Sequence, residues 1–379
     1  MSEAMEVGYD VPALPDMTEA EVQTPCLAID LEPFERNVSR MREICEGLGV
    51  RHRAHGKMHR SADIARYQIE AGGACGICCQ KVSEAEAFQR AGLADILITN
   101  QVTEPAKIDR LARLAGRGRI IVCADDPANV AAISEAAQRR GTQIEVLVEI
   151  ECGAGRCGIA PGAPAVTLAK AIDAAPGLRF SGLQAYQGGA QHKRPFSERQ
   201  ALVEAAIADV RTTVDLLSAA GLACDIIGGA GTGTYNLEGA SGLYNELQCG
   251  SYAFMDADYA KVLDQAGQPI SEFEHALFVL TSVMSTAVPG QAVCDAGLKA
   301  HSIDSGPPVV FGRPGLGIGK FSDEHGVIAD PENTLKLNDR LRLVPGHCDP
   351  TCNLHDWYVG IRNGVVETLW PVTARGKGY

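Results

Sequence analysis

The 379-residue sequence lacks any run of about 18 apolar residues, so it predicts no membrane-spanning helix. Residues 1–6 are acidic and show no basic segment followed by an apolar one, so we expect no secretory signal. Hydrophobic residues make up 46% of the chain and charged residues 21%. This composition is typical of a soluble globular protein and excludes wholesale disorder, collagen and coiled coil. The length favours two domains, or one large barrel with an addition.

Positive charge is also scarce, with 34 Lys and Arg residues against 47 Asp and Glu residues and a net charge of −13. Such a surface repels nucleic acid and anionic lipid, so we expect neither as a partner; solubility is the simplest interpretation of the charge. The 13 cysteines are odd in number and scattered between Cys26 and Cys352, unlike a disulfide framework. Reduced thiols fit a cytoplasmic location better.

Residues from about 50 to 255, within an expected barrel domain of residues 31–267, repeat one pattern, in which a short apolar run is followed by a turn and an amphipathic stretch. The expected strands are 52–57, 74–79, 94–99, 119–124, 144–150, 180–186, 224–229 and 246–254, and helix-like segments include 83–91, 105–115, 127–140, 164–175 and 196–220. Pro105 and Pro127 stand where a helix tolerates proline, and Gly141 and Gly221 follow helices as C-terminal caps do. Eight such units predict a closed (β/α)8 TIM barrel of the α/β class rather than an open sheet.

Residues 268–379 show a different pattern and predict a C-terminal all-β domain. Its expected strands, joined by Gly, Pro, Asn and Asp turns, are 278–285, 291–295, 308–311, 340–344, 357–362 and 365–371. The Asn363-Gly364 pair predicts a hairpin between the last two strands. The strand expected at 26–30 fits either domain, so the N-terminal segment 1–30 could join the β-domain.

The first candidate for chemistry is Lys57, which closes the first expected barrel strand between His55 and His59. A lysine at the mouth of a barrel, shielded by its neighbours, can become a nucleophile toward a carbonyl or a cofactor aldehyde. The alternative is an ordinary surface lysine where a strand ends.

Glycines and hydroxyl residues follow the seventh expected strand and lie within the eighth, a part of the barrel that often binds phosphate. Gly231, Thr232 and Gly233 would direct backbone N–H groups and a hydroxyl at a phosphate, with Ser251 and Tyr252 beside them. A dinucleotide fingerprint would need a third glycine where Thr234 stands. A tight turn without a ligand is the other alternative.

Arg156 and Tyr186 follow the fifth and sixth strands. The arginine can donate hydrogen bonds to a phenolate or carboxylate, and the tyrosine can pack near a planar ring. His192, in the loop after Tyr186, could act as a base near neutral pH. An exposed ion pair for Arg156 and a structural role for the histidine are the alternatives.

His347 and Asp349 are two residues apart, and in an extended segment they would face the same side. Imidazole and carboxylate suit Mn²⁺, Mg²⁺ or Co²⁺ with positions open to water or substrate. A zinc site made by Cys348 and Cys352, together with Cys75 and Cys78, is an alternative. A loop turned by its prolines is another.

Together these motifs resemble the family of D-threonine aldolases and 3-hydroxy-D-aspartate aldolases, pyridoxal-phosphate enzymes with an alanine racemase-like barrel. The similarity runs from Thr24-Pro25 to residue 376 and is most specific at 78–85 and 346–355. It is closest to the 3-hydroxy-D-aspartate (β-hydroxyaspartate) branch. It implies a homodimer that cleaves the Cα–Cβ bond of a small D-3-hydroxy amino acid and yields glycine.

The resemblance also implies a role for each candidate residue. Lys57 would carry pyridoxal 5′-phosphate and His192 would be the base. Arg156, Tyr186 and Gln248 would surround the cofactor ring, and the residues at its phosphate would be Gly231, Thr232, Gly233, Ser251 and Tyr252. His347 and Asp349 would bind the divalent metal. A second substrate carboxylate would need a cation, for which Lys193, Arg194 and His301 are candidates.

Three other functions stay open at this point. A D-serine or 3-hydroxyaspartate dehydratase of the same fold is the first, although such relatives resemble a His-x-Cys metal pair where this chain has Asp349. A racemase is the second, but Gln248 stands where racemases carry an arginine. The third is a non-enzymatic barrel protein that binds the cofactor, which would need no metal pair.

Overall fold

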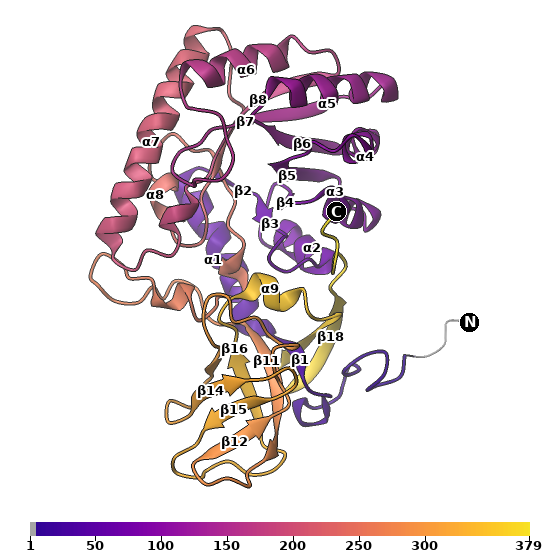
Figure 1. The fold of residues 1–379 in the computed structure, drawn as a ribbon, viewed down its shortest axis with the longest axis vertical. Helices are drawn as coiled ribbons and strands as arrows, with labels where there is room; N and C mark the ends of the chain where they lie inside the picture. The colour runs from indigo at the N-terminus through magenta and orange to yellow at the C-terminus, as the bar shows by residue number, and fades with distance from the viewer. Residues whose placement is uncertain (1–4) are drawn as a thin grey trace.

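The computed structural model describes residues 5–379, which form two nine-stranded sheets. Figure 1 shows the two sheets stacked along the long axis of the molecule, with helices around the first and few around the second. No helix within residues 5–379 has the length and apolar character needed to span a bilayer.

The first sheet is a closed parallel barrel. Its strands are β2 (Arg51–His52), β3 (Ala54–His55), β4 (Ile77–Cys79), β5 (Asp95–Gln101), β6 (Arg119–Ala124), β7 (Ile144–Glu149), β8 (Leu178–Ala185), β9 (Ile226–Gly229) and β10 (Glu246–Leu247). β2 pairs with β10 and β3 pairs with β4, so these two short strands form one barrel position interrupted at Arg53. When β2 and β3 are counted as one strand, the nine strands occupy eight positions around the barrel, which confirms the predicted barrel.

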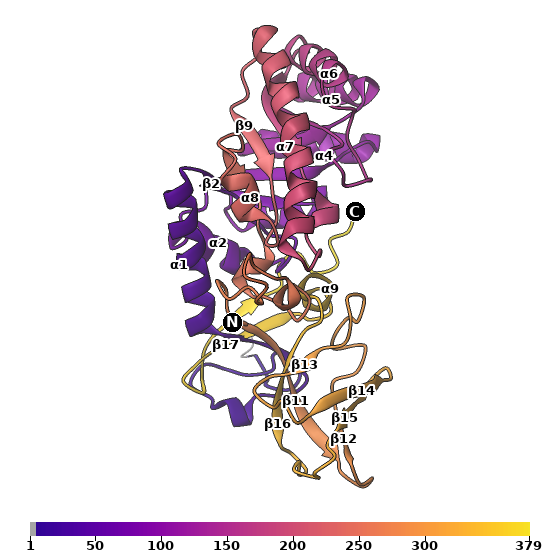
Figure 2. The ribbon, with the colours of Figure 1, turned by 90° about the vertical axis from the view of Figure 1, so that its left-hand side faces the viewer.

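Helices cover the outside of the barrel. They are α1 (Leu31–Leu48), α2 (Ala62–Glu70), α3 (Val82–Arg90), α4 (Pro105–Ala115), α5 (Pro127–Arg140), α6 (Ala163–Asp173), α7 (Phe196–Ala219) and α8 (Tyr235–Gly239). The five predicted helices all form, and their bounds agree within two residues. α1 and α2 were not predicted. Figure 2 shows α1 lying alongside the barrel and reaching the second sheet.

The eighth predicted strand, 246–254, is wrong in length. It ends at Leu247, and a 3₁₀ helix follows at Ser251–Ala253. Gly250 allows this change of direction because a Cβ there would lie 3.0 Å from the carbonyl oxygen of His55. The chain thereby turns across the mouth of the barrel instead of leaving it.

The second sheet is mixed. It contains β1 (Cys26–Asp30), β11 (Leu277–Ser285), β12 (Gln291–Cys294), β13 (Val309–Val310), β14 (Gly317–Phe321), β15 (Gly326–Ala329), β16 (Arg340–Val344), β17 (Trp357–Arg362) and β18 (Val365–Pro371). β1 pairs antiparallel with β11 and parallel with β17, so this strand belongs to the second sheet. Asn363 and Gly364 join β17 to β18 with φ values of 50° and 75°, as a two-residue hairpin turn requires. A short helix, α9 (Cys348–Cys352), precedes β17.

These pairings support a division of the chain that we propose at residues 30 and 267. Residues 31–267 would form the barrel domain, and 268–379 the β-domain, joined by the N-terminal segment 1–30 through β1. Residues 1–4 of that segment lie outside the described residues.

A ring of ion pairs closes the barrel at the N-terminal ends of its strands. Its members are Arg51, Arg53, Arg119, Arg179, Asp95, Glu145, Asp225 and Glu246. Successive N–O distances lie between 2.5 and 3.4 Å, and Arg51 closes the ring by donating to the backbone oxygen of Asp225 at 3.0 Å. Arg53 and Glu246 are fully buried within it. This end of a barrel serves stability rather than catalysis.

We predict that Arg53→Ala lowers the free energy of unfolding by about 3–5 kcal/mol, because it removes the 2.8 Å contact to the buried carboxylate of Glu246 and leaves it the longer 3.4 Å contact to Arg51. Arg139→Ala is the control, since Arg139 is exposed and its nitrogen lies 3.8 Å from Glu135 on the same helix. We expect it to change stability by less than about 0.5 kcal/mol. Urea unfolding measures both variants, and equal effects would contradict a special role for the ring.

Candidate active site

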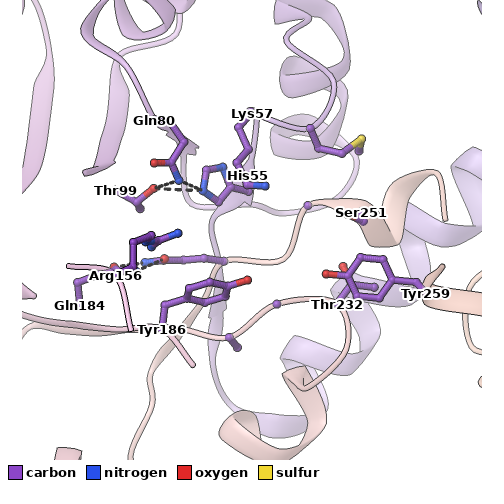
Figure 3. A pocket seen from close by; sticks show the side chains of 15 residues that line it. His55, Lys57, Gln80, Thr99, Arg156, Gln184, Tyr186, Thr232, Ser251 and Tyr259 are labelled. Atoms are coloured by element: carbon purple, nitrogen blue, oxygen red, sulfur yellow. Dashed lines mark hydrogen bonds between the residues drawn. The ribbon is translucent and has the colours of Figure 1, made fainter. Parts of the chain in front are cut away.

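A pocket opens at the C-terminal ends of the barrel strands. The predicted residues that line it are Lys57, Arg156, Tyr186, Gly231, Thr232, Gln248 and Ser251. Figure 3 shows Arg156 at one end, with Thr232, Ser251 and Tyr259 at the other. The barrel thus places most of the candidates, which are far apart in sequence, around one cavity.

Lys57 lies in the turn that follows β3. A Cβ at the preceding Gly56 would come within 2.9 Å of Phe88, so glycine allows the tight exit from the strand. The lysine ammonium forms an ion pair with the carboxylate of Asp349 on α9. Burial opposes the charge of this lysine, but Asp349 outweighs burial and raises the pKa of Lys57 above its usual value. The barrel and the β-domain therefore meet at this contact.

The Arg156 loop is shaped by Glu151. The Glu151 carboxylate accepts hydrogen bonds from the backbone N–H groups of Gly153, Gly155 and Arg156 at 2.6, 3.0 and 3.2 Å. The guanidinium carbon of Arg156 then lies 5.6 Å from the ring centre of Tyr186. Arginine and tyrosine thus stand together on the pocket wall.

Gln191, which the sequence analysis did not single out, organises the glycine–threonine loop. Its Oε1 accepts from the backbone N–H of Gly233 at 3.1 Å, and its Nε2 donates to Thr234 Oγ1 at 2.8 Å. A Cβ at Gly231 would lie 2.4 Å from Gln191 Oε1, and one at Gly233 2.3 Å from the Gln191 backbone oxygen. These contacts require both glycines.

Tyr252 and Gly233 do not line the pocket. The ring of Tyr252 is buried beside His52, and its hydroxyl accepts a hydrogen bond from Gln68 at 3.0 Å. Its backbone N–H donates to Thr232 Oγ1 at 3.0 Å, so Tyr252 contacts the loop only through the backbone.

Two hydrogen-bonded pairs of polar side chains in the pocket were not predicted from the sequence. Gln248 and Gln184 exchange a pair of amide hydrogen bonds of 2.8 Å each, which fixes both side chains. His55 lies 3.1 Å from Thr99 Oγ1 through its Nε2, and its buried Nδ1 has no protein partner within the described residues. Both groups project into the barrel mouth.

His192 lies at the edge of the site and is not among the residues that line the pocket. Its Nδ1 is 2.5 Å from Asp258 Oδ2, and its ring packs 4.9 Å from that of Tyr259, which does line the pocket. The other Asp258 oxygen accepts from Arg194. Burial alone would raise the pKa of Asp258, but Arg194 and His192 lower it, so this carboxylate stays charged. Asp258 and Tyr259 carried no sequence signal that we recognised.

His347 and Asp349 come together, but not through the extended segment that we expected. His347, the N-cap of α9, is extended with φ −147° and ψ 126°, but Asp349 lies in the first turn of the helix, so the extended conformation does not continue through Asp349. His347 Nε2 is nevertheless 3.7 Å from Asp349 Oδ1, which is buried and has no hydrogen-bond partner within residues 5–379. An unpartnered carboxylate oxygen facing an imidazole nitrogen fits a divalent cation.

The alternative zinc site is not formed. No group of three or more metal-binding side chains is brought together within residues 5–379. Cys78 belongs to a cluster of buried apolar residues inside the barrel, together with Leu97 and Ile121. Burial raises the pKa of the Cys348 thiol well above its usual value, so a thiolate is disfavoured there.

The three candidate cations for a second substrate carboxylate occupy different environments. Arg194 is paired with Asp258, and His301 is fully buried with its ring 4.3 Å from that of Phe321. Lys193 is exposed. None of the three lines the pocket, in which Lys57 and Arg156 supply the cationic side chains.

The chain matches two family models, described as "Alanine racemase, N-terminal domain" over residues 29–258 and "Putative serine dehydratase domain" over residues 276–361. A 3-hydroxy-D-aspartate aldolase from Paracoccus denitrificans is 59% identical, across 99% of this chain and 97% of the relative. The chain belongs to the family of 3-hydroxy-D-aspartate and D-threonine aldolases. These enzymes are carbon–carbon lyases.

The chain is also similar to two further relatives. The crystal structure of D-threonine aldolase from Filomicrobium marinum is 46% identical, with a TM-score of 0.94 over 97% of this chain and 100% of that one. A D-threo-3-hydroxyaspartate dehydratase from Delftia sp. is 31% identical across 87% of this chain and 92% of the relative. The match to the alanine racemase model and to the D-threonine aldolase structure confirms the alanine racemase-like fold that the sequence predicted.

Beneath the glycine–threonine loop lies a buried carboxyl group, Glu238, that accepts a hydrogen bond from Thr234 at 2.8 Å. Burial raises the pKa of Glu238 to about 8, although the Thr234 hydroxyl lowers it in part. In the unfolded chain a glutamate titrates near about 4.3. Because the folded state holds the proton more tightly, the stabilisation is complete below that value and is lost as the pH rises through about 8.

We therefore predict that the wild-type melting temperature falls between pH 5 and pH 9, and that Glu238→Gln reduces this fall. The full linkage is on the order of a few kcal/mol, at about 1.4 kcal/mol per pKa unit. Glu204→Gln is the control, because Glu204 is exposed on α7. Identical pH profiles for wild type and Glu238→Gln would contradict a neutral Glu238.

Proposed function

We propose that this protein is an aldolase that uses pyridoxal 5′-phosphate and a divalent metal to cleave D-3-hydroxy amino acids. It would convert 3-hydroxy-D-aspartate to glycine and glyoxylate, and D-threonine to glycine and acetaldehyde. The observation that carries the proposal is the contact between Lys57, in the pocket, and Asp349, beside His347. A lysine for the cofactor and a ligand pair for a metal thus share one site. The identity to the Paracoccus enzyme supports the same reaction.

The residues of the pocket fit the cofactor. Lys57 would hold its aldehyde, and Thr232 and Ser251, with the N–H groups around Gly231, would bind its phosphate at the end of the pocket away from Arg156. Glycine at position 231 leaves room for the side chain of Gln191, which accepts from the Gly233 N–H and so holds this loop. Gly233 and Tyr252 would support the phosphate loop from behind. Arg156, Tyr186 and Gln248 would surround the ring.

The donor atoms at His347 and Asp349 suit Mn²⁺, Mg²⁺ or Co²⁺. One imidazole nitrogen and one carboxylate oxygen leave positions for water and for a substrate hydroxyl. When bound, the metal acidifies the β-hydroxyl and the cofactor withdraws electrons from Cα. The chain's own residues must then move the protons.

His192 would take the proton of the β-hydroxyl. Asp258 accepts the Nδ1–H of His192, which leaves Nε2 with a free lone pair to act as the base. As the hydroxyl loses its proton, the Cα–Cβ bond breaks and the aldehyde forms. Lys57 would return a proton to Cα, and glycine leaves. Tyr259, packed against His192, would keep bulk water from this side of the pocket.

A dehydratase of the same fold would instead eliminate the β-hydroxyl, giving ammonia and a keto acid. The hard oxygen ligand Asp349 supports the aldolase assignment over this alternative. A cytoplasmic location, which the 13 free cysteines favour, and a homodimer, which the family resemblance implies, also belong to this proposal.

The deciding experiment compares 3-hydroxy-D-aspartate, D-threonine and D-serine, with Mn²⁺ and with a chelator, while glycine and ammonia are measured. We expect glycine from the first two substrates, and a loss of at least about 100-fold in rate on chelation. Lys57→Ala should lose both the reaction and the visible absorbance of the bound cofactor. Ammonia without glycine would instead establish the dehydratase, and an unchanged spectrum would contradict the role of Lys57.

For Asp258→Asn we predict a kcat about 10- to 100-fold lower with cofactor absorbance unchanged, because an amide favours the wrong His192 tautomer. Arg194→Met is the matched variant, since it removes the other Asp258 partner and leaves the His192 contact intact. Its kcat should stay much closer to that of the wild type. A kcat for Asp258→Asn equal to the wild-type value would exclude this role.

A further inference from the structure

Asp304 lies in the loop that follows β12 and contacts the outer face of His347. Its Oδ2 is 2.7 Å from His347 Nδ1, on the side of the ring away from Asp349. Two serine hydroxyls hold the Asp304 carboxylate: Ser302 donates to Oδ1 at 2.9 Å and Ser305 to Oδ2 at 3.2 Å. No motif in the sequence had pointed to this residue.

This contact determines which nitrogen of His347 can bind a cation. A carboxylate at Nδ1 accepts the ring N–H, so Nε2 carries the free lone pair. Nε2 faces the buried, unpartnered Oδ1 of Asp349 at 3.7 Å. Both atoms are acceptors, and a cation between them would satisfy both.

The same loop also fixes the backbone of His347. The Ser302 N–H donates to Thr351 Oγ1 at 3.2 Å, and the Thr351 hydroxyl donates to the His347 carbonyl at 2.8 Å. Loop and helix α9 are therefore tied at the backbone as well as at the ring. His347 has little freedom to turn away from Asp349.

We propose that Asp304 is a positioning residue for the divalent metal, which orients His347 so that its Nε2 faces the metal. The inference rests on the proposed function, since it assumes the metal at His347 and Asp349. Carboxylates that accept the second N–H of a ligating histidine typically change metal affinity by about 10- to 100-fold.

The test measures Mn²⁺ binding to the purified protein loaded with pyridoxal phosphate, by titration calorimetry and by the electron paramagnetic resonance signal of free Mn²⁺. We expect Asp304→Asn to weaken binding about 10- to 100-fold, and Asp304→Glu to restore part of the affinity. Asp323→Asn is the matched control, because Asp323 is an exposed carboxylate of the same domain. It should bind Mn²⁺ as the wild type does.

Each result separates this inference from the proposed function. Equal Mn²⁺ affinity of Asp304→Asn and wild type, or equal weakening by Asp304→Asn and Asp323→Asn, would overturn it. A wild-type protein that binds no Mn²⁺ would overturn both the inference and the metal dependence. Weaker binding by Asp304→Asn alone, in a protein that releases no glycine from any substrate, would support the inference and reject the aldolase. Melting temperatures show whether each variant is folded.

Discussion

The ion pair between Lys57 and Asp349 is the constraint on which the site depends, because it joins two domains that supply different chemistry. Lys57 is placed by the first barrel strand, and Asp349 by a short helix next to the second sheet. That helix is anchored by Asp256, whose carboxylate accepts from the Cys348 N–H at 3.3 Å, and by the fully buried side chains of Cys348 and Cys352. Small shifts between the domains would therefore separate the proposed cofactor lysine from the proposed metal pair.

The regular part of the fold was predictable because its signals are local. Prolines at the first turn marked α4 and α5, a glycine after the last turn marked α5, and apolar runs marked the barrel strands. α1 was missed although its buried residues Leu31, Phe34, Val38, Met41 and Cys45 follow a helical period, so its signal was present. β14 is different, because it is largely exposed, contains glycine and gives no apolar run to recognise.

The site was predictable only as far as strand ends could reveal it. Barrel topology brings strand ends together, which is why Lys57, Arg156, Tyr186 and Thr232 meet. The residues that orient them could not be found this way, because Gln191, Asp258 and Asp304 act across the fold on groups in other segments. Tyr252 was predicted at the site but does not line the pocket. Its neighbour Ser251 lines the pocket, whereas the ring of Tyr252 packs into the core against His52. The structure brings the side chains of His347 and Asp349 together, although only His347 is extended and Asp349 lies in a helical turn.

The two histidines of the proposed reaction are oriented by carboxylates in the same way, yet the environments of the carboxylates differ. Asp258 shares its charge with the guanidinium of Arg194, whereas Asp304 is held by serine hydroxyls that carry no charge. A carboxylate whose charge is paired with a guanidinium can still accept the Nδ1–H and orient the imidazole, which is the role proposed for Asp258 at His192. An uncompensated carboxylate favours positive charge on the far side of the ring, which suits His347, a ligand that must retain a cation. The distribution of cations around each carboxylate thus matches the task of each histidine.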